Sequence, residues 1–180
     1  MAHGCQGVFY FVFQLDHQIE DYRLSPIDEH GERTETFGWL ARVNKAFLKT
    51  TAAWFNELEF VRVTHYGKAY GGFELFKGTR LIRRIKSSNE IPLILSEFTD
   101  KDGIDYIAVT NNSMSEPTRI ELIVNGIRPS ILINGWNDNN SYDKTEFVSG
   151  DLTSQGEDFA AVRLRLAPGQ LMLLRISSDV

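Results

Sequence analysis

Hydrophobic and polar positions follow three different patterns along the chain. Residues 7–13, GVFYFVF, form an unbroken aromatic and β-branched run without a polar position. Residues 37–56 place apolar side chains three and four positions apart, which is the spacing of one face of an α-helix. From residue 91 onward, short apolar runs alternate with breaks that contain Gly, Pro or Asn. The pattern therefore predicts one buried strand, one long amphipathic helix and then a series of short strands.

The opening run is typical of a strand that is covered on both faces, as in the middle of a parallel sheet. With the helix that follows it after a polar loop, it makes residues 1–57 half of a β-α-β unit that lacks a second parallel strand. Unpaired backbone groups in a buried strand each cost on the order of a few kcal/mol. Partner strands must come from an upstream region, another chain or the later strands, and we favour an upstream region.

The remaining sequence is all-β in character. Residues 58–90 contain short strand-like runs, which we interpret as connecting strands. Residues 91–180 contain a hairpin signal at Asp102-Gly103, and residues 161–167, AVRLRLA, alternate between apolar and basic positions. Repeated short strands of this kind predict an antiparallel β-sandwich over residues 91–180.

Composition narrows the classes of protein that fit. The net charge of -5 argues against a dedicated nucleic-acid binder, which usually has an excess of Lys and Arg. No apolar stretch approaches the roughly 20 residues of a membrane helix, so we expect no membrane partner. Twelve Phe, six Tyr and three Trp suit strand-rich structure and sugar-contacting surfaces. The basic residues between positions 77 and 86 are interpreted as a solvated strand face, with phosphate binding as a minor alternative.

Residues with reactive side chains form no motif of high specificity. The four histidines lack metal-ligand spacing, so we interpret them as surface or loop residues and expect neither a metal nor a cofactor. Trp136 is interpreted as a cap on the sandwich core, with an exposed sugar platform as the alternative. Five carboxylates that follow the opening strand are interpreted as solvated, because nothing fixes two of them at a catalytic separation. They are Asp16, Glu20, Asp21, Asp28 and Glu29.

The order of these elements resembles the C-terminal part of a (β/α)8-barrel glycoside hydrolase, of the β-galactosidase type in glycoside hydrolase family 42 and its relatives. Residues 2–14, AHGCQGVFYFVFQ, look like the eighth barrel strand of that family. Residues 28–48 resemble the lead into its eighth helix, and residues 93–113, LILSEFTDKDGIDYIAVTNNS, resemble the opening hairpin of its C-terminal sandwich. The resemblance implies a mainly β fold, with an antiparallel sandwich preceded by the last strand and helix of a partial barrel.

The resemblance also implies that the chain is a fragment of a glycoside hydrolase that acts on β-linked sugars and is itself non-catalytic. The two catalytic carboxylates of such barrels follow the fourth and seventh strands, so both are expected upstream of Met1 and no catalytic residue is assigned. A carbohydrate substrate would lie at the carboxyl end of the eighth strand. There the resemblance assigns Phe13 as a subsite wall, beside Gln14 and Asp16 as substrate-binding positions. The family often has Trp followed by Arg at the first two of these, so the stacking wall and one polar contact differ here.

Two other functions fit the sequence. The sandwich could be a carbohydrate-binding module to which residues 1–57 are an appendage. Alternatively, the chain could complete its sheet with a second copy and form a homo-oligomer, since exposed strand edges promote such pairing.

Overall fold

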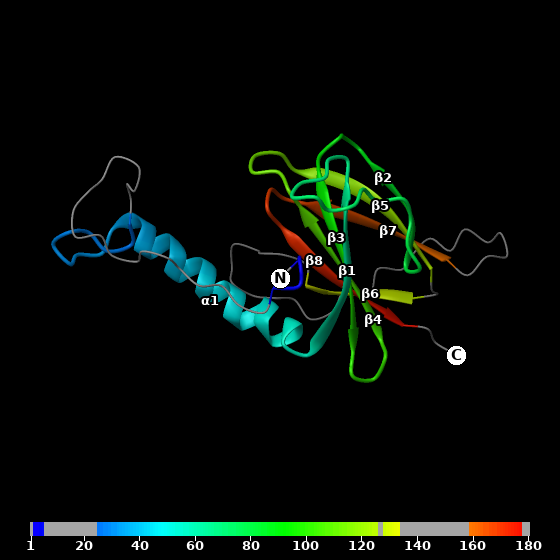
Figure 1. The fold of residues 1–180 in the computed structure, drawn as a ribbon, viewed down its shortest axis with the longest axis horizontal. Coiled ribbons are helices and arrows are strands. Elements are labelled where there is room, and N and C mark those ends of the chain that lie inside the picture. Colours follow the sequence, from blue (N-terminus) through cyan, green and yellow to red (C-terminus); the bar gives the residue numbers. More distant parts are fainter. Residues whose placement is uncertain (1, 6–24, 126–127, 134–158, 178–180) are drawn as a thin grey trace. The chain divides into compact units, whose positions relative to one another are not determined.

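The computed structural model describes residues 2–5, 25–125, 128–133 and 159–177, which contain one α-helix and eight strands (Figure 1). The chain divides into two compact units. One is Cys5–Asn56, and the other combines Met1–Gly4 with Glu57–Val180. The strand expected over residues 7–13 lies outside the described residues. The substrate-binding positions Phe13, Gln14 and Asp16 lie outside them too, and so does Trp136.

Helix α1, Glu35–Phe55, occupies the region where the periodicity predicts a helix. It follows Thr34, whose backbone is extended, and Glu35 places a carboxylate in the first turn, where it interacts favourably with the helix dipole. The N–H of Asn56 closes the last turn by donating to the carbonyl of Ala52 at 3.1 Å. Among its described side chains Phe55 is buried, whereas Leu48 remains 67% exposed.

The eight strands form two antiparallel sheets. The larger sheet has the order β1-β3-β4-β8-β6. Its strands are β1 (Leu58–Tyr66), β3 (Leu93–Asp100), β4 (Asp105–Asn111), β8 (Leu171–Ser177) and β6 (Arg128–Ile133). The smaller sheet has the order β2-β5-β7. Its strands are β2 (Ile82–Ser87), β5 (Thr118–Asn125) and β7 (Phe159–Leu166).

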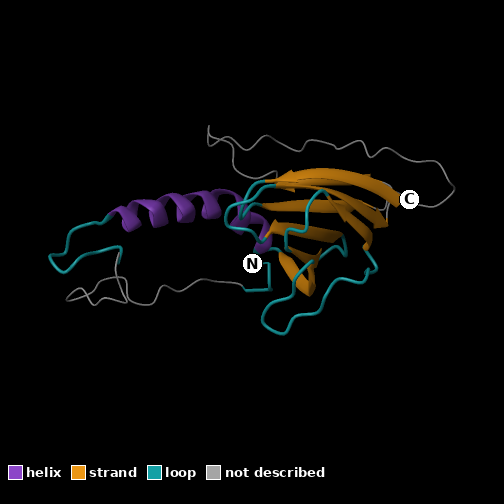
Figure 2. Ribbon diagram, turned by 90° about the horizontal axis from the view of Figure 1, so that it is seen from above, coloured by secondary structure: helices purple, strands orange, loops and turns teal. Residues whose placement is uncertain are grey.

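One hydrophobic core joins the two sheets. Alternate side chains of the smaller sheet meet alternate side chains of the larger sheet in a single buried cluster. The smaller sheet contributes Ile82, Leu122 and Val162, and the larger sheet contributes Leu95, Ile107 and Leu174. The regular structure of this unit consists of strands with connecting loops (Figure 2). The fold is thus mainly β, two antiparallel sheets consistent with the expected β-sandwich.

The strands interpreted as connecting segments over residues 58–90 lie within these sheets. Strand β1 pairs with β3 along its whole length, and β2 pairs with β5. The sandwich therefore begins at Leu58 rather than at residue 91. The named strands pair only antiparallel, so the described part of the chain contains no barrel strand.

Two turns that contain a glycine connect consecutive strands of the sandwich. Gly103, with a φ of 77°, forms the predicted hairpin between β3 and β4, where the carboxylate of Asp100 accepts the N–H of Ile104 at 2.9 Å. Gly169, with a φ of 67°, ends the turn between β7 and β8. Because these two strands belong to different sheets, this turn crosses the sandwich and does not close a hairpin.

The outward faces of the two sheets differ. Ile94, Phe98, Ala108 and Leu173 point away from the core of the larger sheet, yet none is more than 7% exposed. The centre of the larger sheet is therefore covered on both faces. The outward face of the smaller sheet carries charged side chains in solvent, and this face positions the candidate site.

Candidate functional site

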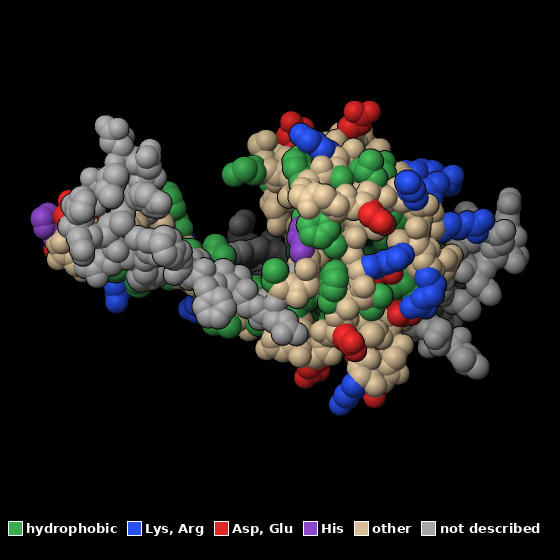
Figure 3. Space-filling model, in the orientation of Figure 1, with side chains coloured by type: hydrophobic (Ala, Val, Ile, Leu, Met, Phe, Trp, Pro, Cys, Tyr) green, Lys and Arg blue, Asp and Glu red, His purple; other side chains and the backbone are tan. Residues whose placement is uncertain are grey.

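The candidate site is the outward face of the β2-β5-β7 sheet. Strand β7 buries Val162 and Leu164 in the core, so the alternation that the sequence predicts turns Arg163 and Arg165 outward. The antiparallel register then sets Arg163 opposite Glu121, and Lys86 lies opposite Glu121 on its other side. Figure 3 shows several Lys and Arg side chains, with acidic ones among them, at the side of the sandwich where Figure 1 places β2, β5 and β7.

The row through Glu121 is an ion-pair network across three strands. One carboxylate oxygen of Glu121 accepts from Lys86 Nζ at 3.0 Å, and the other accepts from Arg163 Nε at 3.2 Å. These hydrogen bonds hold the pKa of Glu121 below its usual value. Glu121 is therefore ionised at neutral pH, and a single carboxylate is shared by two cations.

The next row holds two arginines without a carboxylate. Arg119 lies directly opposite Arg165, and both side chains are exposed. Like charges in this position destabilise a sheet. No ion pair involves either guanidinium in the parts of the chain that the structure describes. The strand register therefore sets two cations opposite each other, and both side chains face solvent.

These rows border an open groove of about 410 Å³. Four basic side chains and one carboxylate line it, which gives a formal charge of +3 in a chain whose net charge is -5. They are Lys86, Arg119, Arg163, Arg165 and Glu121.

Two serines, Ser87 and Ser88, are among the residues that line the groove. Ser88 extends the pairing of β2 beyond its last residue, because its N–H donates to the carbonyl of Arg119 at 2.9 Å. Its hydroxyl accepts the N–H of Arg119 at 3.2 Å. Ser87 lies beside it among the lining residues. The backbone that carries Arg119 is thus held on both sides, by β7 and by Ser88.

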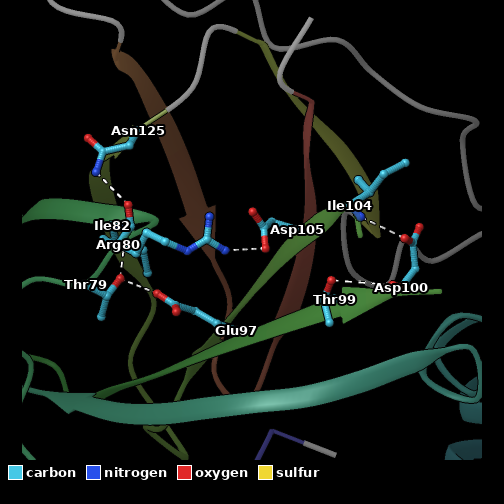
Figure 4. Close-up of polar contacts among 9 residues, drawn as sticks. All are labelled: Thr79, Arg80, Ile82, Glu97, Thr99, Asp100, Ile104, Asp105 and Asn125. Atoms are coloured by element: carbon cyan, nitrogen blue, oxygen red, sulfur yellow. Dashed lines mark hydrogen bonds and ion pairs between the residues drawn. The ribbon is translucent and has the colours of Figure 1, made fainter. Parts of the chain in front are cut away.

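A second polar cluster, at one end of the sandwich, has a structural character (Figure 4). Glu97 on β3 is only 4% exposed and accepts a hydrogen bond from the hydroxyl of Thr79. The same hydroxyl accepts the N–H of Ile82 at 2.9 Å. Beside it, Arg80 forms an ion pair with Asp105 at 2.6 Å. These contacts tie the loop before β2 to the opposite sheet, and they leave no open carboxylate pair for catalysis.

The histidine prediction was wrong for His65. This residue on β1 is 2% exposed, and its ring stacks on Phe73 with centroids 5.2 Å apart. Its Nε2 lies 3.0 Å from Nε2 of His3. Its Nδ1 accepts the N–H of Tyr70 at 3.2 Å, which assigns the proton of the neutral ring to Nε2.

Residues 2–4, which include His3, lie against strands β1 and β3. The hydroxyl of Ser96 donates to the carbonyl of Ala2. Gly4 has a φ of 80°, and a Cβ at this position would lie 2.8 Å from the ring of Phe60. This close approach and the left-handed backbone both require glycine.

The other residues that the sequence singled out fall into two groups. Phe13, Gln14, Asp16, Glu20, Asp21 and Trp136 lie outside the described residues. Asp28 and Glu29 lie in an exposed turn, in which Asp28 Oδ1 accepts the N–H of Glu32 at 2.7 Å, in agreement with solvated loop carboxylates.

Arg119 and Arg165 were not predicted as site residues. The sequence predicts an outward-facing Arg on each of the two strands. The two side chains form a site only because these strands pair, which the sequence does not show. Within the described ranges, no group of three or more His, Cys, Asp or Glu side chains is placed to hold a metal ion. None of the helices there combines the length and apolar character needed to cross a membrane.

Comparison with known proteins adds no identification. No protein-family model matches the sequence, and no curated protein or solved structure matches the chain.

Proposed function

We propose that the chain is a non-catalytic accessory part of a glycoside hydrolase and that its sandwich binds a carbohydrate chain in the groove of the β2-β5-β7 face. The observation that carries this proposal is the groove itself. It is open, has a volume of about 410 Å³, and is lined largely by apolar atoms, among which its residues place hydroxyl, guanidinium, ammonium and carboxylate groups. Such groups form the directional hydrogen bonds that sugar hydroxyls require.

The same groove is unsuited to hydrolysis. A glycoside hydrolase needs two carboxyl groups, about 5–5.5 Å apart when the anomeric configuration is retained. Glu121 is the one carboxylate among the described lining residues, and its lowered pKa keeps it from donating a proton at neutral pH. The groove therefore supports binding without bond cleavage.

Pairing with a second copy through the edge of β1 has weaker support. The edge carries a bulge between Phe60 and Arg62, and bulges blunt the pairing of an edge strand. The N–H of Phe76 donates to the carbonyl of His65 at 2.7 Å, so a loop of the same chain already covers part of this edge.

Affinity electrophoresis through gels that contain single polysaccharides tests the proposed function. We expect at least one polysaccharide to retard the protein, and we expect Lys86→Ala combined with Arg163→Ala to remove the retardation. Lys101→Ala, in the exposed turn between β3 and β4, is the control and should behave as the parent protein does. Unchanged migration in every polysaccharide, neutral and acidic, would contradict the proposal.

A further inference from the structure

We infer that the groove takes an acidic oligosaccharide and that Arg119 and Arg165 together bind one of its uronate carboxylates. This inference rests on the proposed carbohydrate function and deepens it by naming the class of sugar. Its starting point is the charge of the groove. Glu121 already balances part of the Lys86 and Arg163 charge, whereas the Arg119–Arg165 row has no acidic partner among the described residues.

The geometry of this row suits a single carboxylate. Paired strands lie about 4.8 Å apart, and side chains directly opposite have Cβ atoms about 4.5–5.5 Å apart on the same face. Two long side chains that start this close together on one face can reach the same carboxylate. Each guanidinium is a planar fork that binds both oxygens of a carboxylate, so the pair provides directional hydrogen bonds in addition to charge.

The neighbouring row supplies contacts for the uncharged part of a sugar. It lies two residues further along β5 and β7, about 6.7 Å from the arginine pair. There the Glu121 carboxylate offers acceptors to sugar hydroxyls, and Lys86 and Arg163 offer donors. An ion-paired carboxylate in this position accepts hydrogen bonds from sugar hydroxyls but repels a second anion, so one uronate carboxylate, at the arginine pair, is placed in the groove.

Two further observations separate an acidic sugar from other ligands. No aromatic side chain is among the described residues that line the groove. Neutral sugars and single-stranded nucleic acids both gain much of their affinity by stacking on aromatic rings. The net charge of -5 also opposes a long polyanion such as RNA, whose binding depends on an excess of cations over a wide surface. Charge complementarity in this groove therefore favours a uronate.

Isothermal titration of the full chain with uronate oligomers tests the inference. Oligomers of galacturonate, mannuronate and glucuronate are compared with their methyl esters, which keep the sugar ring and lose the charge. We expect one of the three acids to bind and its methyl ester to bind at least about tenfold more weakly, because a charge-assisted hydrogen bond is stronger than a neutral one.

Three variants identify the residues. Arg165→Gln is expected to weaken binding of the acid at least about tenfold and to leave the weak binding of the ester unchanged. Arg119→Lys keeps the charge but removes the fork, so its affinity should lie between those of the parent and Arg165→Gln. Arg84→Gln removes a charge from the same face outside the groove and should change the affinity less than about twofold.

The outcomes distinguish this inference from the proposed function. Equal binding of acid and ester, or equal losses in Arg165→Gln and Arg84→Gln, would overturn the uronate assignment and leave a carbohydrate-binding groove. Binding of inorganic sulfate or phosphate with no preference for a uronate would also overturn it. Failure to bind any acidic or neutral glycan would overturn both. Thermal unfolding excludes loss of fold as the cause, because removal of one arginine from a like-charge pair should not lower the melting temperature.

Discussion

The hydrogen bond between His3 and His65 joins two ring nitrogens, so one of them must lack a proton. Tyr70 fixes the orientation of the His65 ring through Nδ1, which leaves Nε2 of His65 as the donor and Nε2 of His3 as the acceptor. Protonation of His3 would place two N–H groups against each other. The contact therefore stabilises residues 2–4 on the sheet only while His3 is neutral.

Acidification is expected to weaken this contact. Burial, followed by the proximity of His65, lowers the pKa of His3 from its usual value. An unfolded histidine has a pKa of about 6.5, so on acidification the unfolded chain gains a proton that the folded chain disfavours. This part of the free energy of unfolding is fully present above about pH 6.5 and is lost as the pH falls below that value.

Urea unfolding from about pH 8 to about pH 5 measures this effect. His3→Gln keeps an acceptor for His65 and has no charge in this range, so its free energy of unfolding should fall less steeply with decreasing pH than that of the parent. Parallel pH profiles for the two proteins would contradict the proposed role of His3.

The arginine row makes a second prediction for single residues. Arg165→Glu replaces a like-charge pair by an opposite-charge pair with Arg119, so the free energy of unfolding should rise by about 0.2–1 kcal/mol. Arg163→Glu, two positions away on the same face, sets a second carboxylate opposite Glu121 and should lower it. Thermal and urea unfolding measure both changes. If both substitutions stabilise the protein, or both destabilise it, the register of β5 and β7 is wrong.

At the scale of secondary-structure elements, the contact between Thr79 and Glu97 joins the loop before β2 to β3 in the opposite sheet. Because Glu97 is buried, removal of its hydroxyl partner leaves a carboxylate oxygen without its hydrogen bond. We expect Thr79→Val to lower the free energy of unfolding by about 1–3 kcal/mol.

A double-mutant cycle with Glu97→Leu, which removes the acceptor oxygen, measures the coupling between the two side chains. The double variant should be more stable than the sum of the single losses predicts, since each substitution alone already breaks the contact. Additive losses would show that the two residues stabilise the sandwich independently. Ser115, in the exposed loop before β5, offers a control substitution to Ala that should have little effect.

The elements that the sequence predicts well are those with a local signal. The period of the helix, the Asp102-Gly103 hairpin and the alternation over residues 161–167 all depend on neighbouring residues, and the structure has all three. The assignment of residues 58–90 was less accurate. Membership of β1 and β2 in the sheets is decided by pairing with β3 and β5, and that pairing is absent from the local pattern.

The candidate site was not predictable for the same reason. Arg119 and Arg165 are 46 positions apart and become neighbours only through the register of two strands. His65 is buried because residues 2–4 and the loop with Tyr70 and Phe73 pack around it, although its own strand is exposed over residues 59–62. Both features depend on pairing between residues that are far apart in the sequence. Such pairing cannot be inferred from the local pattern of a single sequence.

At the scale of the sandwich unit, burial separates the two sheets by role. The central strands of the larger sheet have buried apolar side chains on both faces, as in a sheet that is shielded from solvent on both sides. The smaller sheet buries one face and exposes charges on the other. The β2-β5-β7 face is therefore the candidate site for a charged ligand. Removal of the ligand's charge should lower its affinity more than a reduction of its size does.

A further prediction concerns the activity of the purified chain toward glycosides. We expect the purified protein to release no product from aryl β-glycosides, because the described groove residues include a single, ionised carboxylate. A colorimetric assay at several pH values measures this. Hydrolysis that is abolished by one Asp or Glu substitution in the chain would contradict the accessory role.

The most direct test of the central claim is an NMR titration of the ¹⁵N-labelled protein with the uronate oligomer that binds best. We expect the amide shifts to change along β2, β5 and β7, most strongly at Arg119, Glu121 and Arg165, and to remain constant along the central strands β3 and β4. Changes confined to β1 and the histidine pair, or spread evenly over the sandwich, would contradict it.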